Sequence, residues 1–177
     1  MAITTISDLK TALNTGARSN LFRVNLTSQL TTDENETFSY LCKAAQLPGS
    51  TLGIIEVPFA AGRRFKAAGD RTFADWTITI INDEDFVVRN AFERWMNGIN
   101  SHAGNVRTGA ASGPAGYTVD ATVTQYGKTG DTLKTYKFVG MYPLDLAPID
   151  LDWGSNDTIE EYAVTFAYQW WETDTTT

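Results

Sequence analysis

The chain has 177 residues, of which 42% are hydrophobic and 20% charged, and its formal net charge is −7. These values predict one globular domain, residues 1–177, with a substantial core, and the negative charge argues against a protein that grips nucleic-acid phosphates. A single cysteine excludes an intrachain disulfide, and we expect neither a membrane-spanning helix nor a secretory signal, because no apolar run is long enough and Met1–Lys10 lacks a basic start.

The first third of the chain predicts an N-terminal arm followed by strands. Residues 1–19 form the expected arm, with a short helix over Ile6–Leu13 capped by Thr5 or Ser7. Apolar and polar residues alternate over 22–27 and over Thr37–Ala44, which is typical of half-buried strands. The strand over Gly53–Phe59 contains Pro58, so we place it at a sheet edge or in an arm.

The middle of the chain predicts one further strand and one helix. Trp76, Ile78 and Ile80 alternate with threonines, as in a strand. From Val88 to Ile99 the apolar residues recur at helical spacing, and acids at 82–85 lie where the helix dipole favours them. We expect Gly98 or Gly104 to end this helix, and the Gly-, Ala- and Ser-rich segment Gly104–Gly116 to be a flexible loop.

The last third predicts more strands and a polar tail. Alternation favours strands over 118–124 and Leu133–Val139, and a long final strand in which Tyr162, Val164, Phe166, Tyr168 and Trp170 share one face. We expect residues 173–177 to be a flexible tail. The fold class is therefore mainly β, a β-sandwich or barrel with one helix packed at the side and extended arms or loops.

The search for catalytic, cofactor-binding and metal-binding residues predicts none. His102 is expected in a surface loop, and Cys42 is expected to pack as a small hydrophobe within a strand. The segment Asp150–Asp157 is similar to a calcium loop, but its glycine is misplaced and a glutamate at the twelfth position is missing. A turn capped by Asp and Asn side chains is the better interpretation.

A basic cluster stands out in this acidic chain. Arg63, Arg64, Lys66 and Arg71 lie within nine residues, beside Asp70, directly after the strand that contains Pro58. One interpretation is a solvated hairpin. Another is an arm, residues 53–71, that reaches the acidic surface of a second copy, since head-to-tail contacts build rings or filaments. Nucleic-acid binding by this arm is disfavoured by the net charge of the chain.

The charge is also uneven along the chain. Residues 138–177 hold eight acids and no Lys or Arg, whereas the remaining 137 residues hold 13 acids and 14 bases. A solvated acidic face explains this pattern, and so does a surface that repels a polyanion.

Four ordered blocks of sequence carry a resemblance to a known family. The stretches Asn20–Val24, Cys42–Pro48, Ala68–Glu84 and Leu151–Ile159, the last running into Tyr162–Phe166, resemble the tail tube protein of contractile-tailed, T-even-like phages. The blocks span most of the chain, in the same order as in that family and at similar spacing. The arm before Asn20, the loop Gly104–Gly116 and the tail 173–177 depart from the family pattern.

The resemblance implies a structural protein of the virion without enzymatic activity. Six copies would form a ring, and stacked rings would form a hollow tube that conducts the genome into the host after sheath contraction. The implied partners are further copies of the chain, the tail sheath, the tape-measure protein, the baseplate and the tail terminator, with assembly in the host cytoplasm. DNA would pass through the lumen without specific binding, and Arg63, Arg64, Lys66, Asp70 and Arg71 would form an inter-subunit contact.

Three alternatives stay open from sequence alone. A tube protein of a related contractile injection or secretion system would share the fold. A ligand-binding β-barrel would use aromatic residues such as Trp76, Trp95 and Trp153 around a pocket, although large aromatics more commonly fill cores. A hydrolase would use a pair among the 21 acids, but the sequence singles out no pair.

Overall fold

The computed structural model describes residues 5–13, 16–27, 29–111 and 113–176. Within these residues the strands are β1 (Phe22–Leu26), β2 (Cys42–Ala45), β3 (Thr51–Pro58), β4 (Arg64–Thr72), β5 (Trp76–Ile81), β6 (Val119–Tyr126), β7 (Thr132–Leu146), β8 (Glu161–Ala167) and β9 (Trp170–Thr173). The helices are α1 (Ile6–Leu13), α2 (Thr32–Leu41), α3 (Val87–Ile99) and α4 (Pro114–Tyr117), with single 3-10 turns η1 (Ala60–Gly62) and η2 (Gly109–Ala111).

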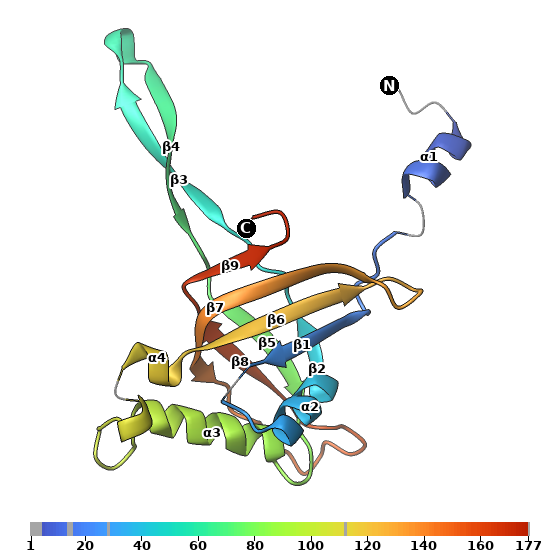
Figure 1. The fold of residues 1–177 in the computed structure, drawn as a ribbon, viewed down its shortest axis with the longest axis vertical. Helices are drawn as coiled ribbons and strands as arrows, with labels where there is room; N and C mark the ends of the chain where they lie inside the picture. Colours follow the sequence, from blue (N-terminus) through green and yellow to red (C-terminus); the bar gives the residue numbers. More distant parts are fainter. Residues whose placement is uncertain (1–4, 14–15, 28, 112, 177) are drawn as a thin grey trace.

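The body is a sandwich of two antiparallel layers that share one long strand. Seven strands follow the order β1-β6-β7-β8-β5-β2, and β9 pairs with β7 as well. The first part of β7 pairs with β6 and β9, and its last part, from Tyr142, pairs with β8. The strand therefore passes from one layer to the other, as Figure 1 shows. The prediction of a mainly β sandwich is confirmed, and the sheet does not close into a barrel.

Gly140 marks the point at which β7 leaves one layer for the other. Its φ is +64°, in the left-handed region that favours glycine. A Cβ atom there would lie 2.9 Å from Cγ of Gln169. A side chain at this position would thus be both strained and in contact with the turn that leads into β9.

The core between the layers is built by the alternating residues that the sequence predicted. Val24 on β1, Ile78 on β5 and Val164 on β8 are buried, and their polar neighbours face outward. The Trp76 ring lies 4.5 Å from Phe138 between centroids, and its indole N–H donates to the Gln46 carbonyl at 2.7 Å. Burial of aromatic rings with a satisfied N–H stabilises the core strongly.

Helix α3 closes one end of the sandwich. Its buried stripe includes Val88, Phe92 and Trp95, and Phe92 meets Phe166 of β8 at 5.7 Å. The acids at 82–85 precede the helix as predicted, and Asp83 accepts a hydrogen bond from the Val87 N–H at 3.3 Å, although the N-cap residue Phe86 makes no side-chain cap bond. The predicted end at Gly98 or Gly104 is wrong, because the helix runs through Gly98 to Ile99.

The predicted strand over Thr37–Ala44 is wrong for its first five residues, which belong to α2. Thr31 and Glu34 form a capping box at the start of this helix: the Glu34 N–H donates to Thr31 Oγ1 at 3.3 Å, and Glu34 Oε2 accepts from the Thr31 N–H at 2.9 Å. The box satisfies the backbone N–H groups of Thr31 and Glu34, which in a strand would need partners on a neighbouring strand. Strand β2 begins only at Cys42, whose thiol is buried as expected.

The segment Gly104–Gly116 is not wholly a loop. It contains η2, in which Ala111 is buried, and most of α4. The indole N–H of Trp95 donates to the carbonyl of Tyr117 at 2.8 Å and so ties α4 to α3. His102 is exposed in the turn after α3, as predicted.

The predicted long final strand is interrupted. Strand β8 ends at Ala167, and the chain turns into β9, where Trp170 is exposed rather than on the core face. The Trp170 indole N–H instead donates to Glu172 at 2.8 Å. The alternation breaks because the Gln169 N–H donates to the Val139 carbonyl at 3.0 Å, which brings the chain back onto β7.

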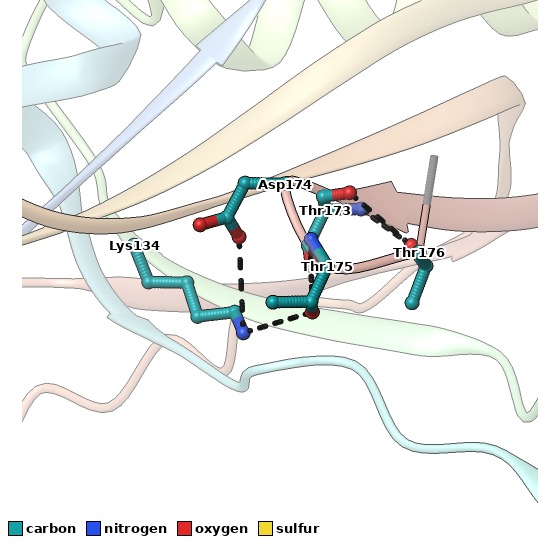
Figure 2. A network of polar contacts seen from close by, with 5 residues as sticks. All are labelled: Lys134, Thr173, Asp174, Thr175 and Thr176. Carbon is teal, nitrogen blue, oxygen red and sulfur yellow. Dashed lines mark hydrogen bonds and ion pairs between the residues drawn. The ribbon is translucent and has the colours of Figure 1, made fainter.

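Thr173, expected in a flexible tail, is the last residue of β9 and is only 5% exposed. Figure 2 shows how the next residues fold back onto it: the Thr173 N–H donates to Thr176 Oγ1 at 2.8 Å, and the Lys134 ammonium donates to Thr175 Oγ1 at 3.3 Å. Lys134 also lies 3.8 Å from a carboxylate oxygen of Asp174. The flexibility of the rest of the tail stays a prediction, and Thr177 lies outside the described residues.

The predicted helix of the N-terminal arm is present as α1, which stands apart from the body in Figure 1. Thr5 caps it, since its Oγ1 accepts from the Asp8 N–H at 3.2 Å. None of its residues is buried, and residues 1–4 and 14–15 of the arm lie outside the described residues. No helix in the described part of the chain has the length and apolarity needed to cross a membrane.

Candidate assembly interface

The hairpin β3–β4 is separate from the body of the molecule. The two strands pair with each other as a two-stranded sheet outside the seven-stranded one. In Figure 1 the hairpin extends from the body along the longest axis of the molecule. Every residue of β3 is exposed. A two-stranded hairpin is only marginally stable in water, so this one needs a partner to cover it.

The register divides the hairpin into two chemically different faces. Val57 lies opposite Phe65 and Ile55 opposite Ala67, so one face is apolar. Glu56 lies opposite Lys66 on the other face, which is charged.

The tip of the hairpin combines an exposed aromatic ring with positive charge. The Phe59 N–H donates to the Arg63 carbonyl at 2.7 Å, and Ala60–Gly62 form the loop between these two residues. Ala61 and Gly62 both have positive φ, which turns the chain tightly. Phe59 is 71% exposed and the neighbouring Phe65 is 65% exposed. Contiguous exposed apolar side chains of this kind mark interaction surfaces.

All five residues predicted as an inter-subunit contact lie on this hairpin, but they form two groups. Arg63, Arg64 and Lys66 lie at the tip, whereas Asp70 and Arg71 lie at the base of β4. Seven residues of extended strand separate Arg64 from Arg71 by roughly 23 Å. Arg64 also has an internal partner, because its guanidinium lies 2.5 Å from the Glu56 carboxylate. Whether these residues contact another subunit stays a prediction.

The base of the hairpin has a close backbone approach. A Cβ on Gly69 would lie 3.1 Å from the carbonyl carbon of Gly53, where the register of the two strands shifts. Glycines at both positions leave room for this close approach of the two paired backbones.

Sequence reasoning missed the apolar half of this surface. It selected the bases, but Ile54, Ile55, Phe59 and Phe65 on the same hairpin are also exposed. A signal was present: Ile55, Val57 and Phe59 alternate with Glu56 and Pro58, so the strand has an apolar side directly before a strongly basic run.

A second unpredicted surface lies in the segment between β7 and β8. Trp153, a residue considered for a ligand pocket, is 101% exposed, and Leu151 and Ile159 are exposed beside it. The segment contains the Asp- and Asn-rich turn expected at 150–157, in which Asp152 accepts a hydrogen bond from the Gly154 N–H at 2.9 Å. Among the described residues, no group of three or more His, Cys, Asp and Glu side chains could hold a metal ion.

Buried titratable groups outside the hairpin serve the fold. Burial raises the pKa of the Cys42 thiol to about 12 and also raises the pKa of Tyr162. The Asp120 carboxylate is partly buried, but hydrogen bonds from Lys137 at 2.8 Å and from the Gly140 N–H outweigh that burial and lower its pKa. None of these groups adjoins the hairpin tip.

Comparison with known proteins identifies what such a hairpin-bearing sandwich is. A family model described as "phage tail tube protein" matches residues 10–174. The chain belongs to the phage tail tube protein family. Over 170 residues it is 38% identical to the tail tube protein gp19 of Enterobacteria phage T4, covering 94% of this chain and 99% of that protein. It is 25% identical over 170 residues to the tail tube protein of Serratia phage KSP90, covering 93% and 94%.

Solved structures share the fold of this tail tube protein. A chain from the baseplate of the anti-feeding prophage matches with a TM-score of 0.66 and 14% identity, covering 89% of this chain and 94% of that one. A chain from the sheath–tube complex of an extracellular contractile injection system, PVC, matches with a TM-score of 0.62 and 16% identity, covering 97% and 98%. The resemblance to contractile phage tail tube proteins drawn from the sequence is confirmed.

Proposed function

We propose that this chain is the repeating subunit of a contractile phage tail tube, in which six copies form a ring and rings stack into a hollow tube. The observation that carries the proposal is the isolated β3–β4 hairpin, in which every residue of β3 and most of β4 are exposed, in a member of the tail tube family. Such a surface is unfavourable in a solitary subunit and favourable in a polymer. The subunit has a structural role in the virion and no catalytic one.

The proposed partners follow from this role. Copies of the chain contact one another within and between rings, and the finished tube meets the sheath, the tape-measure protein, the baseplate and the tail terminator. Chains of similar fold occur in a baseplate and in a sheath–tube complex, which supports this set. Assembly takes place in the host cytoplasm, and the genome passes through the lumen without specific binding.

The alternatives from the sequence are less well supported. Identity of 38% to a phage tube protein, against 14–16% to chains of injection systems, favours the phage tail. Trp76 and Trp95, which a ligand-binding barrel would place around a pocket, instead lie in the core beside Phe166. Both indole N–H groups already have backbone partners.

Negative-stain electron microscopy of the purified chain over a range of concentrations, beside mass measurement by light scattering, tests the proposal. Hollow rings or tubes of uniform width are expected as the concentration rises. When tubes require nucleation, adding purified baseplates should start them. A chain that stays monomeric at every concentration, and also after baseplates are added, would overturn the proposal.

A further inference from the structure

The segment between β7 and β8, residues 147–160, presents apolar side chains that no part of the described chain covers. Trp153 is fully exposed, and Leu151 and Ile159 are 80% and 68% exposed. They border an open groove of about 590 Å³ that runs from Pro148 to Glu161. We call residues 147–160, with this groove, the β7–β8 socket.

The β7–β8 socket is held in shape by its own turns and by Ile149, which packs against the hydrophobic core. The Ser155 N–H donates to the Asp152 carbonyl at 3.1 Å, and Asp157 has a φ of +59°. At its end, Asn82 donates to the Glu160 carboxylate at 2.9 Å, which ties the segment to the turn before α3. A preformed surface with an exposed tryptophan is the kind of anchor on which interfaces concentrate their binding energy.

The charge of the β7–β8 socket is opposite to that of the hairpin tip. The socket contains Asp150, Asp152, Asp157 and Glu160 and no Lys or Arg. Asp150 and Asp157 are exposed. The hairpin tip carries Arg63, Arg64 and Lys66 around two exposed phenylalanines. Arg89 and Lys43 reach the edges of the socket, but they are paired with Glu93 and Glu161, and Glu56 near the tip is paired with Arg64. The socket is therefore negative overall and the tip positive, so the two surfaces are complementary in charge.

The two surfaces lie at opposite ends of the molecule. Figure 1 shows the hairpin at one end of the longest axis and the segment between β7 and β8 at the other, near the start of α3. A copy displaced along this axis brings its hairpin tip toward the socket of the next. Two different, complementary patches at opposite ends generate a head-to-tail assembly that can be extended by further copies.

We infer that the β7–β8 socket receives the β3–β4 hairpin tip of a second copy of this chain in the adjacent ring. Phe59 lies against Trp153 and Leu151, and the bases of the tip face the acids of the socket. The inference rests on the proposed tube function and names the acceptor for its hairpin. It commits to a second copy rather than to another tail component, because the complementary surface is found on the same chain.

Site-directed cross-linking tests the inference. The variants Ala60→Cys, in the tip, and Ser155→Cys, in the socket, are mixed under assembly conditions and treated with a short bismaleimide. Covalent dimers that contain one chain of each variant are expected, at least tenfold more abundant than with either variant alone. Cys42 is buried in every variant and stays unmodified. Lys128→Cys, on the β6–β7 turn, replaces Ser155→Cys in the matched control and should give no dimer above background.

The outcomes separate the inference from the proposed function. Tubes that form without an Ala60–Ser155 cross-link, or that cross-link equally with Lys128→Cys, would overturn the socket and leave the tube function standing. Absence of rings and tubes from the unmodified chain, even with baseplates, would overturn both. A second variant, Trp153→Ala, should keep the fold and raise the concentration needed for assembly at least tenfold. If it forms tubes normally but no longer binds sheath, the socket serves another partner and the inference is wrong.

Discussion

At the scale of single residues, two tryptophans have different roles because one is buried and the other is exposed. Trp76 is 2% exposed and packs on Phe138, whereas Trp153 has no cover in the subunit. Sequence alternation identified Trp76 as a core residue, because it belongs to a strand with a clear polar face. Trp153 lies in a turn without periodicity, so its position could not be derived from pattern.

Truncating the two tryptophans should separate folding from assembly. Trp76→Ala is expected to lower the free energy of unfolding by about 3–5 kcal/mol, since it removes a large buried ring and leaves a cavity. Trp153→Ala should change it by less than about 0.5 kcal/mol, as is usual for surface substitutions. Urea unfolding of both variants below the assembly concentration measures the difference. A loss under about 1 kcal/mol for Trp76→Ala would contradict the core assignment.

The α2 capping box predicts a specific loss of stability in acid. Partial burial opposes ionisation of Glu34, but hydrogen bonds from the Thr31 N–H and from Arg94, with the charge of Arg94, outweigh it and lower the pKa of Glu34 below 4.5. Because the folded pKa is the lower one, the stabilisation is present above about pH 4.5 and is lost as pH falls through the folded value.

Replacing this carboxylate should remove that pH dependence. Glu34→Gln keeps an oxygen that can accept from the Thr31 N–H, but it removes the charge that Arg94 and the helix dipole favour, so it is expected to cost about 0.5–1 kcal/mol at pH 7 and less below pH 4. Glu36→Gln, on an exposed position of the same helix, is the matched control. Thermal unfolding followed from pH 3 to pH 7 measures both. An equal loss at all pH values would show that the charge of Glu34 is not what stabilises α2.

The residue scale also refines which bases at the hairpin tip to change. Reversing Arg64 would place a second carboxylate beside Glu56, its partner at 2.5 Å, and so disturb the hairpin itself. Arg63 lies at the end of the tip loop with its side chain exposed. Reversal of Arg63 is therefore the cleaner test of contacts made with another subunit.

At the scale of elements, the sequence predicted strands where one face is buried and failed where another signal competed. The strand over Trp76–Ile81 and the helix that begins at Val87 were placed well, because their periodicity is set by the core. Phe38, Tyr40 and Cys42 mimic strand alternation, but Thr31 and Glu34 start a helix that overrides it. The capping-box spacing was visible in the sequence and outweighs three alternating residues.

The hairpin is the element whose role the sequence specified least. Pro58 indicated a sheet edge or an arm, and it ends β3 of a hairpin that pairs only with itself; the contact surface inferred from the bases stays a prediction. The length and isolation of the hairpin follow from which strand pairs with which, and that information is not local in sequence. The same reason hides the β7–β8 socket, whose complementary surface lies about ninety residues earlier in the chain.

Removing the hairpin should leave the subunit folded. Replacing residues 53–69 by a short Gly-Ser linker deletes a sheet that shares no strand pairing with the body. The melting temperature of the monomer is expected to change by less than about 2 °C, which corresponds to roughly 0.5 kcal/mol for a chain of this size. Calorimetry measures this value, and sedimentation shows whether assembly is lost. A large destabilisation would mean that the hairpin supports the sandwich and is not an arm.

At the scale of the whole molecule, the uneven charge along the sequence becomes a difference in charge between the two ends of the fold. The sequence showed a basic cluster and an acidic C-terminal third, and left open whether the acids are merely solvated. In the fold the two lie at opposite ends of the long axis, the bases on the hairpin and part of the acids in the β7–β8 socket. A subunit whose two ends carry opposite charge favours head-to-tail assembly, in which every copy points the same way.

Charge reversal at both ends provides a test of this polarity. Arg63→Glu and Asp150→Lys should each raise the concentration needed for assembly about tenfold, which corresponds to about 1.4 kcal/mol per contact. The double variant restores opposite charges at every interface of the polymer, with the signs exchanged. It should therefore assemble within about threefold of the unmodified chain, and Lys128→Glu, away from both ends, should have no effect. Light scattering at several concentrations measures all four variants.

Salt dependence distinguishes a direct pairing of these charges from a general effect of net charge. Raising the ionic strength from about 0.15 M to 1 M shortens the screening length from about 8 Å to about 3 Å. Assembly of the unmodified chain and of the double variant should then weaken, and that of the single variants should improve because their repulsion is screened. Single-variant defects that simply add in the double variant, at any salt concentration, would show that Arg63 and Asp150 do not meet. The hairpin tip would then have to dock elsewhere on the adjacent ring.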